Sequence, residues 1–184
     1  LATMMFSGDS PHLVDQNQAV VILIQRFSHR IGKSTMMKND TDHVEWLFAS
    51  RKRDWHYWRR YRDYLESKLS DVVVEGIDEA TEDILKLLED PRRTAPWDRR
   101  GLVVGHVQSG KTSNYSGLIC KAADAGYKII IVLAGMHNNL RSQTQMRLEE
   151  SFLGYETTVD RDPGMPIGVA EFGDDLKTNS ATTR

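Results

Sequence analysis

The residues best suited to chemistry form a glycine-rich octapeptide at 105–112, with the sequence Gly-His-Val-Gln-Ser-Gly-Lys-Thr. It fits the pattern G-x-x-x-x-G-K-[ST] at every fixed position. Gly105 and Gly110 allow the backbone to turn tightly, so that N–H groups of the loop, including those of Gln108 and Ser109, can approach phosphate oxygens. The octapeptide therefore predicts a phosphate-binding loop.

Two side chains at the end of the octapeptide complete the expected site. Lys111 can reach β- and γ-phosphates as a compact cation, and Thr112 offers a hydroxyl to Mg²⁺, which prefers oxygen ligands. A helix beginning near Gly110 would direct its free N–H groups and positive end at the same anion. We expect ATP and Mg²⁺ as cofactors, with Lys111 and Thr112 acting on the phosphates. The alternative is an ordinary glycine-rich turn between a strand and a helix.

The elements around this loop predict an α/β fold. Residues 102–104 and 129–133 are apolar at every position, which suits strands covered on both faces of a parallel sheet. Helices are expected over 112–125, ended by Gly126, and over 138–152. This order predicts the start of a doubly wound parallel sheet within 91–184. Two strands cannot complete such a sheet, so we expect only the N-terminal part of that domain.

Residues 43–90 form a predicted helical region, whereas residues 1–42 can be assigned no role. One helix is expected over 54–69, because its apolar residues recur at three- and four-residue spacings. These are Trp55, Trp58, Tyr61, Leu65 and Leu69. A second helix is expected from Asp78, as its N-cap, to the Asp90-Pro91 pair, where the residue before proline leaves the helical conformation.

Residues 51–62 combine cations with aromatic rings, in the sequence RKRDWHYWRRYR. Such a segment could hold phosphates and stack on bases of a nucleic acid. The alternative is structural: the rings belong to the helical core, and the acidic helix that follows neutralises the cations.

The loop at 134–144 precedes the last predicted helix and partly resembles a segment with which superfamily-two helicases grip nucleic acid. Ala134, Leu140 and Gln143 agree with that segment, but its Pro-Thr pair is absent. The candidate nucleic-acid contacts are Asn138, Asn139, Arg141 and Gln143. Helix N-terminal amides together with Arg141 could bind a DNA phosphate. An exposed helix start without such a role is the alternative.

Composition sets limits on the class of protein. With 184 residues, 40% hydrophobic and 27% charged, the chain has the composition of a globular domain, and its net charge of −2 excludes a uniformly basic nucleic-acid coat. Its one cysteine, Cys120, favours a reducing compartment and is expected to be a buried filler. Neither a secretory signal nor a membrane span is recognisable, so we expect a cytoplasmic protein without membrane contact.

Several segments resemble the Z-one domain family, which is described as a family of prokaryotic endonucleases. The resemblance lies in residues 90–105, 107–112, 121–127 and 138–145, and extends from about Trp58 to Gly154. It implies a superfamily-two helicase-like ATPase with a RecA-like P-loop domain, in which Gly105, Gly110, Lys111 and Thr112 bind nucleotide. It also implies an acidic metal-binding motif further along the chain than Arg184. Such proteins occur near DNA methyltransferases and nucleases, which suggests restriction or phage defence.

The sequence therefore predicts the ATP-binding N-terminal portion of a DNA-acting ATPase with an endonuclease role. We expect this chain alone to bind nucleotide without appreciable turnover, because phosphoryl transfer also needs a carboxylate-held metal and usually an arginine from another lobe. The alternatives are a non-catalytic DNA-binding or assembly module and a P-loop kinase.

Overall fold

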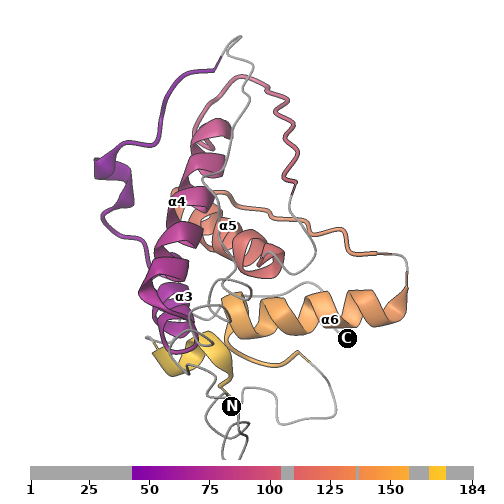
Figure 1. Ribbon diagram of the computed structural model, residues 1–184. Coiled ribbons are helices and arrows are strands. Elements are labelled where there is room, and N and C mark those ends of the chain that lie inside the picture. Colours follow the sequence, from indigo (N-terminus) through magenta and orange to yellow (C-terminus); the bar gives the residue numbers. More distant parts are fainter. Residues whose placement is uncertain (1–42, 105–109, 136, 158–165, 173–184) are drawn as a thin grey trace, which may run out of the picture. The chain divides into compact units, whose positions relative to one another are not determined.

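The computed structural model describes residues 43–104, 110–135, 137–157 and 166–172. The chain consists of two compact units, 1–33 and 34–184, and all described residues belong to the second of these units. The described part contains four α-helices, shown in Figure 1: α3 (Tyr57–Glu66), α4 (Asp71–Leu87), α5 (Lys111–Ala125) and α6 (Asn138–Leu148). Shorter helical segments are η1 (Ala49–Lys52), η2 (Glu149–Leu153) and η3 (Gly168–Phe172).

The predicted α/β fold is wrong for the described residues, which are all-α and contain no sheet. Residues 102–104 and 129–133 form no strand, and the β-pairing within the described part is an isolated bridge between Tyr155 and Pro166. A strand of a parallel sheet is buried on both faces, yet Leu102 and Leu133 are 88% and 91% exposed. The apolar composition of these two segments predicted that they would be buried, but in the described structure they are exposed.

Helix α3 confirms the helix predicted over 54–69, with narrower bounds. Trp58, Tyr61 and Leu65 are buried along one side of it, and Trp55 is buried just before it begins. Leu69 lies beyond the end of α3 and remains partly exposed. The three- and four-residue spacing therefore identified the buried face.

Helix α4 begins at Asp71, with Ser70 as N-cap, so the prediction of Asp78 as N-cap is wrong. The first turns carry Val72, Val73 and Val74, and β-branched residues are weaker helix formers than leucine or alanine. Packing against the rest of the core stabilises these turns: four residues on one side of α4 are buried, Val74, Ile77, Thr81 and Leu85. The helix ends at Leu87, ahead of Pro91, as predicted.

Helix α5 lies between two glycines in the left-handed conformation, Gly110 (φ 74°) and Gly126 (φ 108°). Gly126 N–H donates to the carbonyl of Ala122 at 3.2 Å, and Tyr127 N–H donates to the same carbonyl at 3.0 Å. Left-handed glycine after the last turn is the common way to end a helix. The helix predicted over 112–125 and its end at Gly126 are confirmed.

The core forms where α5 meets α3 and α4. Gly117 permits close approach, because a Cβ atom there would lie 3.1 Å from the Trp58 ring and 3.3 Å from the Thr81 methyl group. Trp46 and Leu47 from the segment before η1 and Val169 from η3 complete this core. The helical region and the helix after the phosphate loop therefore share one hydrophobic core.

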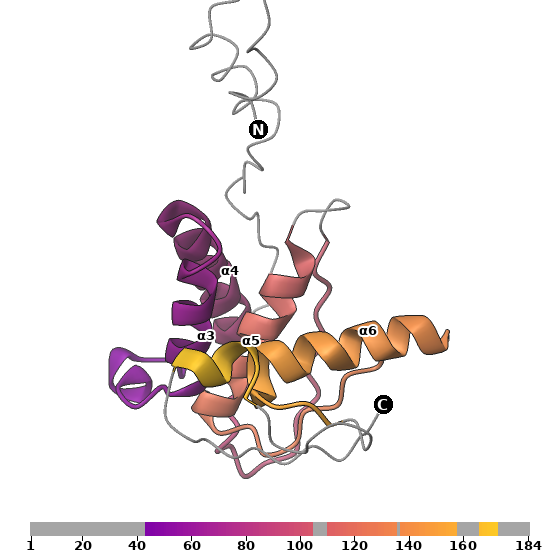
Figure 2. The same cartoon turned by 90° about the horizontal axis from the view of Figure 1, so that it is seen from below.

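Helix α6 differs from the others because none of its residues is buried. In Figure 1 and Figure 2 it extends away from α3 and α4. Its backbone continues into the π-helical turn η2, where Glu149, Ser151 and Leu153 are buried. The helix predicted over 138–152 is confirmed, with this change of helix type at its end. Across the described residues, no helix is both long and apolar enough to traverse a bilayer.

Replacing Gly117 with leucine should lower the free energy of unfolding by about 1–3 kcal/mol, because overpacking displaces neighbouring side chains. This loss is expected although leucine favours helix more than glycine does. Urea unfolding would measure it. The control is Gly101→Leu, where a Cβ atom meets nothing within 4 Å. Equal stability of the two variants would contradict the close contact at Gly117.

Candidate phosphate-binding site

The described part of the predicted phosphate loop is the start of α5. Gly110 is its N-cap, and Lys111 and Thr112 occupy the first two positions; all three are exposed. The other predicted residues, Gly105, Gln108 and Ser109, lie outside the described residues.

The backbone conformation at residue 110 favours glycine. Its φ of 74° lies in the left-handed region, where a residue with a Cβ atom is strained, although a Cβ would meet nothing within 4 Å. Its carbonyl accepts hydrogen bonds from the N–H (3.1 Å) and from Nδ2 (3.3 Å) of Asn114. These bonds fix the orientation of Gly110 at the helix start.

The charges at this helix start favour an anion. The N-terminus of a helix carries a partial positive charge, which acidic side chains commonly offset. The first turn of α5 contains no acidic residue and begins instead with Lys111. A phosphate would offset the positive end of the helix while accepting hydrogen bonds from N–H groups of the first turn.

Thr112 is the described candidate for a Mg²⁺ ligand. Burial raises the pKa of the Tyr115 phenol, and a side-chain hydrogen bond with Thr112 partly opposes this shift. The Thr112 side chain is therefore close to the Tyr115 phenol, one turn further along α5. Within the described residues, no three His, Cys, Asp or Glu side chains gather where a metal could bind. Thr112 fits a Mg²⁺ ion whose other ligands are phosphate oxygens and water.

The side of α5 that faces α3 and α4 carries polar contacts that sequence reasoning missed. The Lys121 side chain is 0% exposed, and its ammonium binds both the carboxylate of Asp78 and, at 2.6 Å, the Asp78 carbonyl. The ammonium also lies 4.3 Å from the centroid of the Trp58 ring. Burial lowers the pKa of Lys121, and Asp78 opposes that shift. The charge is thus paired with a carboxylate and held against an aromatic face.

Asp124, one turn further along α5, caps the start of α3. Its carboxylate accepts hydrogen bonds from the backbone N–H groups of His56 (2.9 Å), Tyr57 (3.1 Å) and Trp58 (2.8 Å). Burial raises the pKa of Asp124, and these three bonds partly offset the rise. A helix is usually capped by a side chain next to it in sequence. Here the capping residue comes from another helix.

The candidate nucleic-acid residues lie together at the start of α6. Asn138, Asn139, Arg141 and Gln143 are all exposed in its first two turns. His137, the N-cap residue, makes no side-chain cap bond. The exposed amide and guanidinium groups can reach a ligand without rearrangement of a core.

The contacts of residues 51–62 support the structural alternative for that segment. Trp55, Trp58 and Tyr61 are buried. Cations of the segment pair with carboxylates of α4 and of the turn after it: Arg51 with Asp90 at 2.6 Å, Lys52 with Glu82 at 2.8 Å, and Arg62 with Asp78 at 3.2 Å. The acidic helix thus neutralises part of the basic segment.

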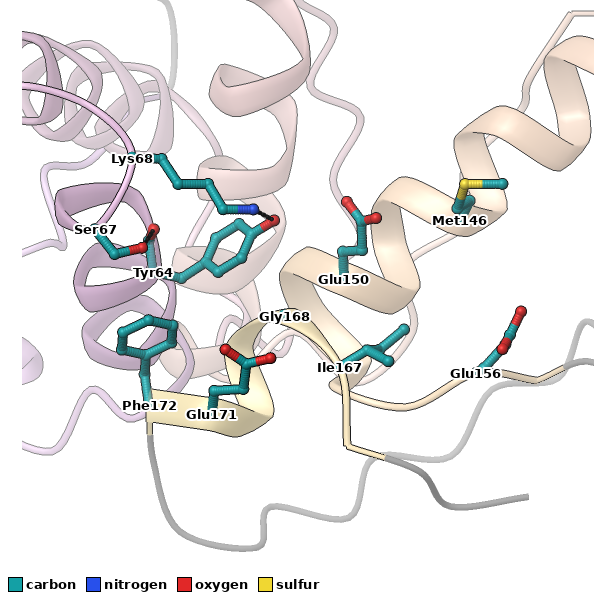
Figure 3. A pocket seen from close by; sticks show the side chains of 10 residues that line it. All are labelled: Tyr64, Ser67, Lys68, Met146, Glu150, Glu156, Ile167, Gly168, Glu171 and Phe172. Carbon is teal, nitrogen blue, oxygen red and sulfur yellow. Dashed lines mark hydrogen bonds between the residues drawn. The ribbon is translucent and has the colours of Figure 1, made fainter. Parts of the chain in front are cut away.

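A pocket of about 400 Å³ lies between the end of α3, the junction of α6 with η2, and η3 (Figure 3). Its lining includes Glu150, Glu156 and Glu171. The nearby cation, Lys68, donates a hydrogen bond of 2.5 Å to the Tyr64 hydroxyl. Three carboxylates beside one engaged lysine disfavour a phosphate group. The pocket is therefore a poor candidate for the nucleotide.

Comparison with models of protein families found no match to this chain, and comparisons with curated proteins and with solved structures found none either. The resemblance to the Z-one domain family remains a prediction.

Cys120 is buried on α5, and its thiol donates to the Ser151 carbonyl at 3.6 Å. Burial raises the pKa of this thiol, and nearby Asp124 adds to the rise. At pH 8 the folded chain should therefore react with iodoacetamide at least about 100-fold more slowly than the urea-unfolded chain, because alkylation requires opening of the core. Mass spectrometry would give both rates, since the chain has one cysteine. Comparable rates would contradict the burial of Cys120.

Proposed function

We propose that this chain binds ATP with Mg²⁺ through residues 105–112. The observation that carries the proposal is the start of α5: a left-handed glycine is followed at once by an exposed lysine and an exposed threonine, with no acidic residue in the first turn. The sequence pattern supports this ligand through residue types, and the helix start supports it through backbone conformation.

In this proposal Lys111 would neutralise charge on the β- and γ-phosphates, and the Thr112 hydroxyl would serve as a ligand of the Mg²⁺ ion. Bound Mg²⁺ supplies charge stabilisation for phosphoryl transfer. Hydrolysis also needs a residue that orients the attacking water. In the family that the chain resembles, an acidic motif also holds the metal ion, so Lys111 and Thr112 are proposed as the phosphate-contacting part of a larger catalytic site.

The resemblance extends the proposal to a helicase-like, DNA-acting ATPase with an endonuclease role in bacterial restriction or phage defence, alongside DNA methyltransferases or nucleases. DNA would contact Asn138, Asn139, Arg141 and Gln143. Support comes from α6, which has no buried residue and whose four candidate contacts are all exposed. A DNA-binding module that instead uses residues 51–62 has less support, because its aromatic rings are buried and several of its cations are paired.

Lys111→Ala should weaken binding of Mg-ATP by about 10- to 150-fold, because a hydrogen bond to a charged group contributes about 1.5–3 kcal/mol. Isothermal titration calorimetry with the whole chain would measure the affinity. Lys128→Ala is the matched control: it removes the same charge from an exposed residue just past the other end of α5. Equal affinities of the two variants would refute the proposed site.

Arg141→Ala should weaken binding of duplex DNA of any sequence, because a phosphate contact is lost. For the same reason, the slope of log affinity against log salt concentration should fall in magnitude by about one. Fluorescence anisotropy at several salt concentrations would measure both quantities. Arg92→Ala, at an exposed arginine in the turn after α4, is the control. A salt dependence unchanged by Arg141→Ala would exclude α6 from the DNA contact.

A further inference from the structure

The contacts that hold α5 against the neighbouring helices lie on one side of α5, at its middle and at its end. We call the position of α5 in which these contacts are made its seated position. These contacts involve residues at three- and four-residue spacings, which share a helix face: Ser116, Gly117, Cys120, Lys121 and Asp124. Lys111 lies on the opposite side of the same helix. The contacts that hold α5 are thus separated from the groups proposed to bind phosphate.

Several of these contacts are directional polar bonds. Ser116 and Ser151 are joined at 3.0 Å between their hydroxyl oxygens, and the Lys121 ammonium and the Asp124 carboxylate bind partners on α4 and at the start of α3. Apolar packing tolerates small rotations, whereas hydrogen bonds weaken steeply when their angles change. Gly117 adds a close contact with Trp58 and Thr81. Together these contacts fix the position of α5 along its own axis and its rotation about that axis.

We propose that Lys121 and Asp124 are positioning residues that couple phosphate binding at the start of α5 to the start of α3. This inference rests on the proposed nucleotide site. In the seated position of α5, Asp124 caps three amides of α3 while the N–H groups of the first turn of α5 face the ligand. Displacement of α5 breaks the cap and misdirects those N–H groups. A phosphate that prefers the seated position therefore also strengthens the cap.

We expect the effect of this coupling at the start of α3. His56 and Arg59 are exposed there, and exposed Arg53 and Asp54 precede them in the sequence. A ligand shifts a conformational equilibrium only by its difference in affinity for the two states, and the coupling is equal in both directions. Occupancy of the phosphate site should stabilise the start of α3, and loss of the cap should weaken phosphate binding by the same factor.

The test compares Mg-ATP affinity in the whole chain carrying Asp124→Asn or Lys121→Met. We expect each variant to bind about tenfold more weakly, within the range of about 5- to 150-fold typical of coupled sites. Asp54→Asn, the same change at an exposed carboxylate just before α3, should bind as the unaltered chain does. Circular dichroism would establish that each variant is folded at the assay temperature.

A second measurement uses the unaltered chain. Hydrogen exchange at the amides of His56, Tyr57 and Trp58 should slow when Mg-ATP binds, by more than exchange at the amides of α4. A purely structural role for Lys121 and Asp124 would lower thermal stability without changing ATP affinity, and ATP would not slow exchange selectively at these three amides.

Two results would overturn the inference. One is unchanged ATP affinity in folded Asp124→Asn and Lys121→Met. The other, decisive even where a variant does not fold, is ATP binding to the unaltered chain without selective protection of residues 56–58. If the unaltered chain and Lys111→Ala both fail to bind ATP, the proposed nucleotide site is itself refuted and this inference with it. That result differs from a chain that binds ATP normally but shows no coupling.

Discussion

The described structure depends on a buried positive charge. Lys121 is fully buried, and burial of an unpaired ammonium would cost several kcal/mol. The Asp78 carboxylate and carbonyl and the face of the Trp58 ring compensate that cost. They belong to α4 and α3, whereas Lys121 belongs to α5. The compensation is complete only when the three helices are assembled together, which makes α5 part of the same core as the helices that precede it.

This constraint accounts for features that were misread in the sequence. Asp78 resembles a helix N-cap because aspartate often occupies that position, but in the structure it lies inside α4 and binds Lys121 and Arg62. Asp124, to which the sequence analysis assigned no role, caps α3 from the side. The partner of Lys121 is 43 residues distant in sequence, and those of Asp124 are 66 to 68 residues distant. Local spacing carries no information about contacts over such distances.

What the sequence did predict depends on local rules. The spacing of Trp58, Tyr61 and Leu65 identified the buried face of α3, and Gly126 identified the end of α5 through its left-handed conformation. The predicted strands depended on non-local information, because a strand exists only when another strand pairs with it. Residues 102–104 and 129–133 have strand-like composition without such pairing in the described part. Gly110, Lys111 and Thr112 were predictable as a helix start because their preferences act over a single turn.

The two ends of α5 differ in how much they pack against the rest of the structure. Its buried residues begin at Ser116 and continue to Ala125, so that packing is concentrated away from the first turn. The first turn begins with the exposed side chains of Lys111 and Thr112, follows a left-handed glycine and contains no acidic residue. If packing were placed at the first turn, it would cover the N–H groups that an anion needs, whereas a helix without packing would not hold those groups in a fixed direction. An open first turn on a firmly seated helix is therefore the arrangement that a phosphate site at this position requires.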